Sequence, residues 1–406
     1  MNSNYNRIGD HIRLVDERNT GLKVKSLLGL SISKQFIPSV ANTVGTDMEN
    51  YKIIRKNQFA CSTMQVRRDK KMPVALLQEI DEAIISQAYP VFEVTNADEL
   101  LPEYLMMWFS RQEFDREACF YAVGGVRGSL EWEDFCDMKL PIPKPDKQKA
   151  IVAEYNTIVN RIALNNRLIQ KLEETAQAIY RHWFVEFEFP DSEGKPYKSN
   201  RGAMVESELG EIPKGWRVDV ISNLVTVKDG THDSPEPTEL GYPLVTSTHL
   251  NLYDIALNET YNISSEDFIQ VNKRSKVDKH DILFSMIGTI GIINYILYDE
   301  INFAIKNVGL FKTSEKKGIA EYILYFLKSE YLKKHLASSL LGSTQNYVTL
   351  SFLRGIPILV PTDNLLLTFE NYAEKIVDRI YLKVKENKLL RNMSQLLLSK
   401  LATIEN

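Results

Sequence analysis

Three polar, glycine-containing segments carry the side chains of this sequence that are best suited to specific polar contacts. Residues 229–235 read DGTHDSP, residues 279–291 read KHDILFSMIGTIG, and residues 342–346 read GSTQN. Hydroxyl, imidazole and amide groups of this kind can bind the phosphates or base edges of a nucleic acid. A well-capped turn explains the same residues without a ligand, so each segment alone leaves both interpretations open. The candidate contact residues are Thr231, His232, Ser234, Ser285, Thr289, Lys306, Gln345 and Asn346.

A basic segment in the first half of the chain is a second candidate. The formal net charge of the whole chain is −4, which does not indicate a nucleic-acid binder. Between Tyr51 and Leu77, however, seven basic residues stand against a single acidic one, Asp69. Such a cluster is the usual electrostatic footprint of a phosphate-binding surface, although a solvated charged face has the same composition. The candidates here are Lys52, Arg67, Arg68, Lys70 and Lys71.

Signatures of catalysis are missing from the sequence. It contains no G-x-x-x-x-G-K-[ST] phosphate loop, no G-x-G-x-x-G turn after a strand and no H-x-x-x-H metal pair. The Asn-Pro-Pro or Asp-Pro-Pro tetrapeptide of amino-methylating enzymes is also absent. Residues 190–195, PDSEGK, imitate a nuclease signature, but the carboxylates are too close in sequence, and a polar turn explains them better. Three cysteines without a C-x-x-C pair argue against a zinc site and favour a reducing cytosol. We therefore expect a binding protein that has no catalysis, metal or cofactor of its own.

The elements that position these loops occur twice in the chain. Residues 103–114, EYLMMWFSRQEF, are echoed by residues 321–332, EYILYFLKSEYL. The segments LPIP (140–143) and IVNRI (158–162) likewise return as IPIL (356–359) and IVDRI (376–380), each about 216–218 residues later. This period is far longer than a solenoid repeat and indicates a duplicated domain followed by a duplicated helix.

The duplication also pairs two loops that carry different side chains. Residues 124–128, GGVRG, occupy the place that residues 342–346 hold in the second half. Arg127 is a side-chain type that favours guanine, whereas Gln345 and Asn346 favour adenine. This difference is expected if one scaffold reads two different sequences.

Two long helices are predicted from heptad periodicity. Apolar residues spaced three and four apart run from Ile151 to Trp183, and no Pro or Gly interrupts residues 147–185. The one polar position on this stripe, Asn165, is of the kind that fixes register and partner number. The second helix, over residues 364–403, keeps the stripe less strictly, and an antiparallel intrachain pair is the simplest arrangement. An ordinary long core helix is the alternative. The candidate spacer and partner-docking residues are Ile158, Ile162, Asn165, Ile169, Leu172, Ile376, Ile380, Leu390 and Leu397.

The predicted fold class is α+β, with two mixed globular domains joined by two long antiparallel coiled-coil helices in a pseudo-twofold repeat. Strands are expected over residues 59–66, 88–94 and 224–227, and a helix over residues 102–114. Residues 282–298 carry no charge but contain two glycines, so two strands around a turn are expected instead of a membrane span. The expected boundaries are 1–143 (first domain), 144–189 (helix), 190–208 (linker), 209–361 (second domain) and 362–406 (helix).

The chain resembles the specificity subunit of type I restriction-modification systems. The resemblance lies in DGTHDSP (229–235), KHDILFSMIGTIG (279–291), GSTQNYVTLSFLRGIPI (342–358) and GGVRGSLEWEDFCDMKLPIP (124–143), and in the block–helix–block–helix order that covers essentially the whole chain. The first block departs from the pattern, because it lacks a DGTH-like turn and residues 21–45 do not align with the second block.

The resemblance implies two target-recognition domains, each reading one half of a bipartite site in double-stranded DNA, as part of phage defence. It implies helices that set the spacer and dock two methyltransferase subunits, with restriction subunits also in the complex. S-adenosylmethionine, ATP and Mg²⁺ would act in these partners, in the cytoplasm. The alternatives are a stand-alone coiled-coil DNA-binding or scaffold protein, an S-like half of a fused restriction enzyme, and an enzyme with an unrecognised site.

Overall fold

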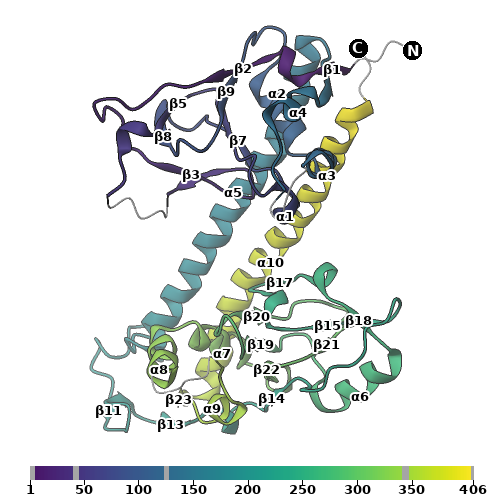
Figure 1. Cartoon of the computed structure of the whole chain (residues 1–406). Helices are drawn as coiled ribbons and strands as arrows, with labels where there is room; N and C mark the ends of the chain where they lie inside the picture. The colour runs from purple at the N-terminus through teal and green to yellow at the C-terminus, as the bar shows by residue number, and fades with distance from the viewer. Residues whose placement is uncertain (1–4, 40–44, 123–127, 341–346, 404–406) are drawn as a thin grey trace. The chain divides into compact units, whose positions relative to one another are not determined.

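The computed structural model describes residues 5–39, 45–122, 128–340 and 347–403 (Figure 1). The chain forms two compact units: Met1–Ala163 together with Lys388–Asn406, and Leu164–Asn387. Each unit contains sheets and helices, which confirms the predicted α+β fold class.

The first unit contains a series of short strands and helices. In order they are β1 (Tyr5–Arg7), β2 (Ile12–Val15), β3 (Leu28–Leu30), β4 (Phe36–Pro38), β5 (Lys52–Arg55), β6 (Gln58–Cys61), α1 (Val66–Asp69), β7 (Val74–Leu76), β8 (Glu82–Ile85), β9 (Val91–Val94), α2 (Pro102–Phe109), α3 (Gln112–Tyr121), α4 (Trp132–Asp137) and β10 (Lys139–Pro141).

The second unit follows the same plan with more strands. In order they are β11 (Met204–Val205), β12 (Ile212–Pro213), β13 (Arg217–Val220), β14 (Val227–Asp229), β15 (Tyr242–Val245), β16 (Leu250–Asn251), β17 (Asp254–Ile255), β18 (Asn262–Ile263), α6 (Ser265–Ser275), β19 (Ile282–Ser285), β20 (Ile293–Tyr295), β21 (Ala304–Ile305), β22 (Val308–Phe311), α7 (Ala320–Leu327), α8 (Glu330–Leu340), α9 (Leu350–Arg354) and β23 (Pro357–Val360). Two long helices, α5 (Pro145–Phe184) and α10 (Asp363–Lys400), contribute to both units.

The internal repeat is present in the topology of the two units. A four-stranded antiparallel sheet has the order β2-β9-β6-β7 in the first unit and β14-β22-β19-β20 in the second. A separate antiparallel pair precedes each long helix, β1 with β10 and β13 with β23. The helices α2, α3 and α4 follow the first sheet as α7, α8 and α9 follow the second. The repeat predicted from sequence is therefore a shared structural frame.

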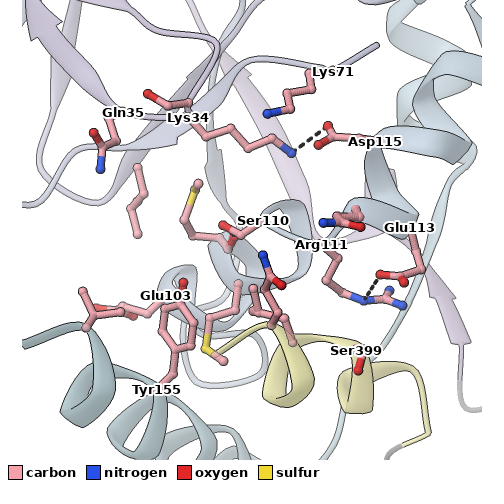
Figure 2. A pocket seen from close by; sticks show the side chains of 18 of the residues that line it. Lys34, Gln35, Lys71, Glu103, Ser110, Arg111, Glu113, Asp115, Tyr155 and Ser399 are labelled. Atoms are coloured by element: carbon pink, nitrogen blue, oxygen red, sulfur yellow. Dashed lines mark hydrogen bonds and ion pairs between the residues drawn. The ribbon is translucent and has the colours of Figure 1, made fainter. Parts of the chain in front are cut away.

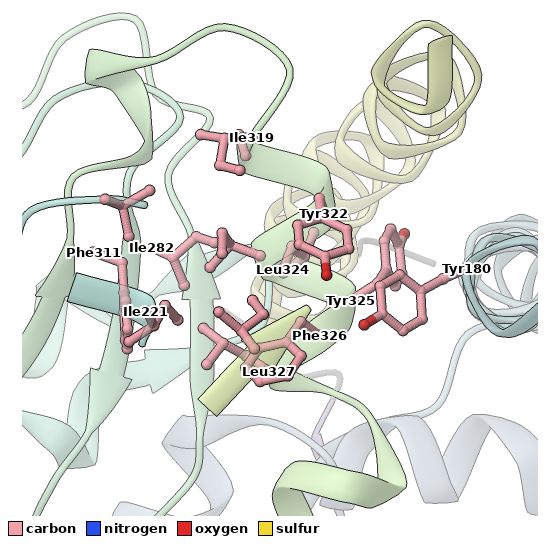
Figure 3. Packing of buried hydrophobic residues seen from close by; sticks show 14 of the residues in the cluster. Tyr180, Ile221, Ile282, Phe311, Ile319, Tyr322, Leu324, Tyr325, Phe326 and Leu327 are labelled. Carbon is pink, nitrogen blue, oxygen red and sulfur yellow. The ribbon is translucent and has the colours of Figure 1, made fainter. Parts of the chain in front are cut away.

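Aromatic and aliphatic packing joins each sheet to its helices. In the first unit Phe92 on β9 contacts Phe109 of α2 and Phe135 of α4 at ring distances of 6.2 and 5.7 Å. In the second unit Ile282 of β19 and Phe311 of β22 belong to one buried cluster with the apolar residues of α7. Figure 3 shows α7 between these two strands and Tyr180 of α5. Every residue of α7 is buried, including its one charged residue, Glu321.

Several predicted element boundaries were wrong. The strand predicted over residues 59–66 ends at Cys61, and a short helix begins at Val66 after Gln65 with a φ of 65°. The strand predicted to begin at residue 88 begins at Val91, because Pro90 cannot donate a hydrogen bond to a neighbouring strand. The strand predicted over residues 224–227 begins only at Val227 and reaches Asp229. The helix predicted over residues 102–114 is broken by extended backbone at Arg111.

The two-strand interpretation of residues 282–298 is confirmed. Strands β19 and β20 pair antiparallel with Ile282 opposite Tyr295, and Gly288 and Gly291 in the connecting turn adopt φ of 77° and 88°. Within the described segments of the chain, every helix is too short or too polar to cross a lipid bilayer.

The long helices pack against each other through the predicted stripe. In the second unit Trp183 contacts Phe369 at a ring distance of 5.8 Å, while Asn165 meets Asn387, so α5 and α10 run antiparallel there. In the first unit Leu398 and Leu401 pack in one cluster with Tyr155. All ten stripe positions of α5 are buried or half-buried.

The polar residues on the stripe are paired across the seam. Asn165 is 1% exposed, and its Nδ2 donates to Oδ1 of Asn387 at 3.0 Å. Asn387 is 2% exposed and donates to Oδ1 of Asn166 at 2.8 Å. Asn387 in the polar middle of α10 therefore provides the hydrogen-bond acceptor for the polar stripe position of α5, Asn165.

Candidate nucleic-acid interface

The loops of the second unit that carry the predicted contact residues leave the same end of its four-stranded sheet. Strands β14 and β19 end at Asp229 and Ser285, and their antiparallel neighbours β22 and β20 begin at Val308 and Ile293. Because neighbouring antiparallel strands run in opposite directions, these four termini lie together. Tyr347 forms a bridge with Ile287, which brings the segment after residue 346 there as well. We call residues 230–235, 286–292, 306–307 and 347–349 the second loop end.

Backbone contacts hold the DGTHDSP turn rigidly at this end. The amide of Gly230 donates to the carbonyl of Val308 at 2.9 Å, and that of Thr231 donates to the carbonyl of Ile305 at 3.0 Å. A Cβ atom on residue 230 would lie 2.4 Å from the Ile305 carbonyl oxygen, so only glycine permits this close approach. The amide of Asn307 closes the arrangement by donating to the Thr231 carbonyl at 3.1 Å. The turn therefore presents its side chains from a fixed backbone.

The side chains of the turn form a charged cluster around Asp229. The Asp229 carboxylate is 5% exposed and accepts hydrogen bonds from Arg274 of α6 and from His232, whose Nε2 lies 2.9 Å away. Nδ1 of His232 lies 2.8 Å from Oδ1 of Asn307. The buried carboxylate thus positions His232 and Arg274, whose side chains remain 64% and 57% exposed.

A cleft of about 340 Å³ lies beside this cluster, between the turn and α6. Thr231, Ser234, Gln270 and Arg274 line it, and Lys306 donates to the hydroxyl of Ser234. These groups are hydrogen-bond donors and acceptors that can bind phosphate oxygens or base edges. Sequence reasoning missed Arg274, Gln270 and Asn307, because their place in the chain gives no sign that they meet residues 229–234.

Ser285 and Thr289 occupy different positions in the β19–β20 turn. Ser285 is fully buried, and its hydroxyl donates to the Thr289 carbonyl at 2.6 Å and accepts from the amide of Ile292 at 2.7 Å. Its hydroxyl therefore holds the turn together and does not face solvent. The side chain of Thr289 is exposed at the tip.

The first unit gathers four of its five candidate cations at the equivalent end of its sheet. The connection from β6 to β7 contains α1, which carries the exposed Arg67 and Arg68, and the exposed Lys70 and Lys71 follow it. Arg68 is paired with Asp69 at 2.7 Å. We call residues 16–18, 62–73, 90 and 128–130 the first loop end.

Two other cations of the basic segment are paired with carboxylates. Lys52 is half-buried with its Nζ 3.6 Å from Asp16, and Arg55 forms ion pairs with Glu17 at 2.7 Å and Glu82 at 2.6 Å. The first loop end also receives the segment that follows residue 127, because the Arg67 amide donates to the Gly128 carbonyl at 3.3 Å. Arg127, Gln345 and Asn346 lie outside the described residues.

The candidate helix residues face the seam. Ile158, Asn165 and Ile380 are buried, and the remaining candidates are half-buried, namely Ile162, Ile169, Leu172, Ile376, Leu390 and Leu397. A second set of apolar residues on α10, which sequence reasoning missed, is 54–66% exposed: Leu382, Leu389, Met393 and Leu396. Their spacing of seven, four and three places them on one face of the helix, beside the stripe that packs against α5.

The described residues contain no cluster of metal-ligating side chains. Within them, no three His, Cys, Asp or Glu side chains are placed to hold a metal ion. Burial raises the pKa of the Cys61 thiol far above its ordinary value, so this cysteine is not an activated nucleophile.

Comparison with known proteins gives the family. The type I restriction modification DNA specificity domain matches residues 44–174 and 213–376, one stretch in each half of the chain. The MjaVIII specificity subunit of Methanocaldococcus jannaschii is 26% identical over 277 residues, which are 66% of this chain and 62% of that protein's length. The HindI specificity subunit of Haemophilus influenzae is 22% identical over 381 residues, covering 80% and 81% of the two chains.

A solved structure shares the fold. The type I restriction-modification S subunit from M. genitalium aligns with a TM-score of 0.57 at 15% identity, covering 99% of this chain and 96% of the other. The family domain matches more than half of the chain, and the shared fold agrees with that match. The chain belongs to the type I restriction modification DNA specificity family, which includes the specificity subunits of these enzymes.

Proposed function

We propose that this chain is a DNA-reading subunit of a type I restriction-modification complex, in which each unit reads one half of a bipartite target. The observation that carries the proposal is the shared frame with unlike loop ends. The two four-stranded sheets have the same strand order, yet α1 with its basic residues occupies the β6–β7 connection where the second unit has a glycine turn. A duplicated frame with diverged loops is suited to reading two different sequences.

The two loop ends supply different contact chemistry. The first presents Arg67, Lys70 and Lys71, which suit phosphate oxygens or guanine. The second presents His232 and Arg274, which the buried Asp229 carboxylate holds in place. We assign base and phosphate contacts to these exposed groups and to Thr231, Ser234, Thr289 and Lys306, and we extend the proposal to Arg127, Gln345 and Asn346.

The long helices have two proposed roles. Their paired seam sets the spacer between the half-sites, because a continuous helix has a fixed rise per residue. The exposed apolar residues of α10 in the first unit, Leu389, Met393 and Leu396, support docking of methyltransferase subunits, since an exposed apolar patch marks an interaction surface. Methylation with S-adenosylmethionine and ATP-driven cleavage with Mg²⁺ are proposed to lie in the methyltransferase and restriction subunits.

Domain exchange combined with methylation mapping tests the proposal. Residues 1–143 are replaced by the corresponding block of a relative, and N6-methyladenine is mapped in cells that express the chain with its methyltransferase partner. We expect one half of the methylated sequence to change and the other half and the spacer to stay. The reciprocal exchange of residues 209–361 is the matched control and should change the other half only. A change in both halves from either exchange contradicts the modular assignment.

A finer version tests the second loop end. His232→Ala together with Arg274→Gln should relax or abolish recognition of one half-site. The double variant Lys195→Gln/Lys198→Gln is the control, because these lysines lie in the segment between α5 and β11. Equal loss of methylation in both variants would mean that the loss of positive charge in general, and not the loss of the second loop end's contacts, weakens recognition.

A further inference from the structure

A pocket of about 1170 Å³ in the first unit has features that DNA reading at the loop ends does not explain. It is lined by the β3–β4 turn, the first turn of α3, parts of α2, α5 and α10, the residues that follow α1 in the first loop end, and the end of β7, all from the first unit. Five cationic side chains face it, Lys34, Lys70, Lys71, Arg111 and Arg116, against three carboxylates, Glu103, Glu113 and Asp115.

Arg111 is the unusual member of this set. Its side chain is 5% exposed, and its Nε has no hydrogen-bond partner among the described residues. Its ion pair is with Glu113, and Nε lies 3.7 Å from that carboxylate, beyond hydrogen-bond distance. The same carboxylate also meets Arg116 at 3.2 Å, and the Glu117 carboxyl acts electrostatically on Arg111 as well. A buried donor without an acceptor is costly, and Arg111 therefore favours an additional acceptor in the pocket.

Packing fixes the direction of this guanidinium. Cζ of Arg111 lies 3.9 Å from the ring centre of Trp108, a stacked cation–π contact. Stacking on one face leaves the in-plane N–H groups available, which is the geometry that matches the two oxygens of a carboxylate or phosphate. Arg111 also precedes the first turn of α3, a ten-residue helix whose N-terminus has no side-chain cap. Its free amides add positive potential to the same place.

Neighbouring charges leave the site positive. Lys34 lies in a tight turn, reaches the pocket and donates to Asp115 at 2.8 Å and to the carbonyl of Phe109. Burial lowers the pKa of Lys34, and Asp115 opposes this shift. Lys71 is exposed at the rim, so it supplies a further cation (Figure 2).

The opposite side of the pocket is mixed, with apolar residues beside Glu103, Asn156 and Ser399. Met106, Val152, Tyr155 and Leu398 line it, and Figure 2 shows Tyr155 across the pocket from Lys34 and Lys71. Concave pockets that combine apolar surface with a few convergent polar anchors are typical of small-molecule sites. The equivalent position of the second unit differs: the residue 218 positions after Arg111 is Ser329, and the residue before it, Lys328, is paired with Glu173.

We propose that this pocket binds a phosphorylated small molecule, with its phosphate on Arg111 and Lys71 and its organic part against Met106, Tyr155 and Leu398. The site would share Lys70 and Lys71 with the first loop end and would add Arg111 and the apolar groups, which lie outside the loop end.

Calorimetric titration of the full-length chain with phenyl phosphate, inorganic phosphate and phenol tests the proposal. Phenyl phosphate should bind more tightly than either of its parts, because it engages both walls of the pocket. Arg111→Gln should weaken it about tenfold or more, the size expected when a charge-assisted hydrogen bond is lost. Lys71→Gln, at an exposed position that leaves folding intact, should weaken it several-fold, and Arg111→Lys should restore it only in part.

A matched control distinguishes binding in this pocket from a general effect of positive charge. Arg13→Gln removes an exposed arginine of β2 that does not line the pocket and should leave binding unchanged. Equal binding by wild type, Lys71→Gln and Arg111→Gln, with circular dichroism showing that all are folded, overturns the proposal. If a short duplex of unrelated sequence displaces phenyl phosphate and Arg111→Gln weakens duplex binding to the same extent, the pocket binds DNA phosphates and the small-molecule assignment is wrong.

Discussion

The pair Asn165–Asn387 gives the sharpest test of how the two helices are matched. Asn165→Ala removes the donor to Oδ1 of Asn387, and both side chains are at most 2% exposed. An acceptor left unsatisfied in a buried seam costs about 1–3 kcal/mol. The higher helix propensity of alanine offsets about 0.5 kcal/mol of this loss in the free energy of unfolding. We therefore expect a net loss of roughly 1.5 kcal/mol, or about 3–6 °C in melting temperature for a unit of this size.

A double-mutant cycle separates the pairwise interaction from the individual substitutions. Asn165→Ala/Asn387→Ala should be less destabilising than the sum of its single changes, with a coupling free energy of about 1 kcal/mol. The assay is urea denaturation followed by helical circular dichroism. Gln170→Ala is the matched control, because Gln170 lies on the exposed face of α5 and donates a hydrogen bond to Glu174. Additive effects of the two asparagine changes, or a loss no larger than the control's, would refute the buried-pair reasoning.

Three more predictions concern a buried carboxyl, a buried ion pair and the length of the helices. Glu321 is 2% exposed and accepts from Tyr295 Oη at 2.7 Å; burial raises its pKa to about 7. The folded state thus binds the proton more tightly than the unfolded state. The free energy of unfolding should therefore fall by about 3 kcal/mol as pH rises from 4.5 to 7. Glu321→Gln should remove this pH dependence in urea denaturation measured at several pH values. Lys328→Met should lower the free energy of unfolding by about 3–5 kcal/mol, because it leaves the buried Glu173 without its cation. Adding Glu173→Gln to the same chain should recover much of this loss. The absence of any recovery would contradict the ion-pair argument. Insertion of seven residues after Leu164 together with seven after Asn387 adds about 10 Å of helix and keeps the heptads. The methylated target should then gain about three base pairs of spacer with both half-sites unchanged, and an altered half-site in the methylation map would count against the spacer role.

The sequence by itself determined the repeated and periodic features of this protein. Heptad spacing predicted α5 over residues 147–185, and the helix spans Pro145–Phe184, because periodicity of side chains along one helix is a local property. The stripe also predicted a buried polar position at Asn165, and the echo of EYLMMWFSRQEF in EYILYFLKSEYL predicted the shared frame. The split between α2 and α3 at Arg111 escaped prediction, since no proline or glycine marks a break between residues 103 and 121.

Tertiary structure decided which polar groups meet. Asp229 was visible in the DGTHDSP motif, but only the fold brings Arg274 and Asn307 to it from distant places in the chain. Ser285 was an apparent contact residue and is instead enclosed in its own turn. Cations that are close in the basic segment also have different surroundings in the fold. Lys52 and Arg55 are paired with carboxylates, whereas Arg67, Lys70 and Lys71 are exposed at the first loop end. Periodicity reports which face of an element is buried, whereas charge pairing and pockets depend on contacts between elements that no local pattern encodes.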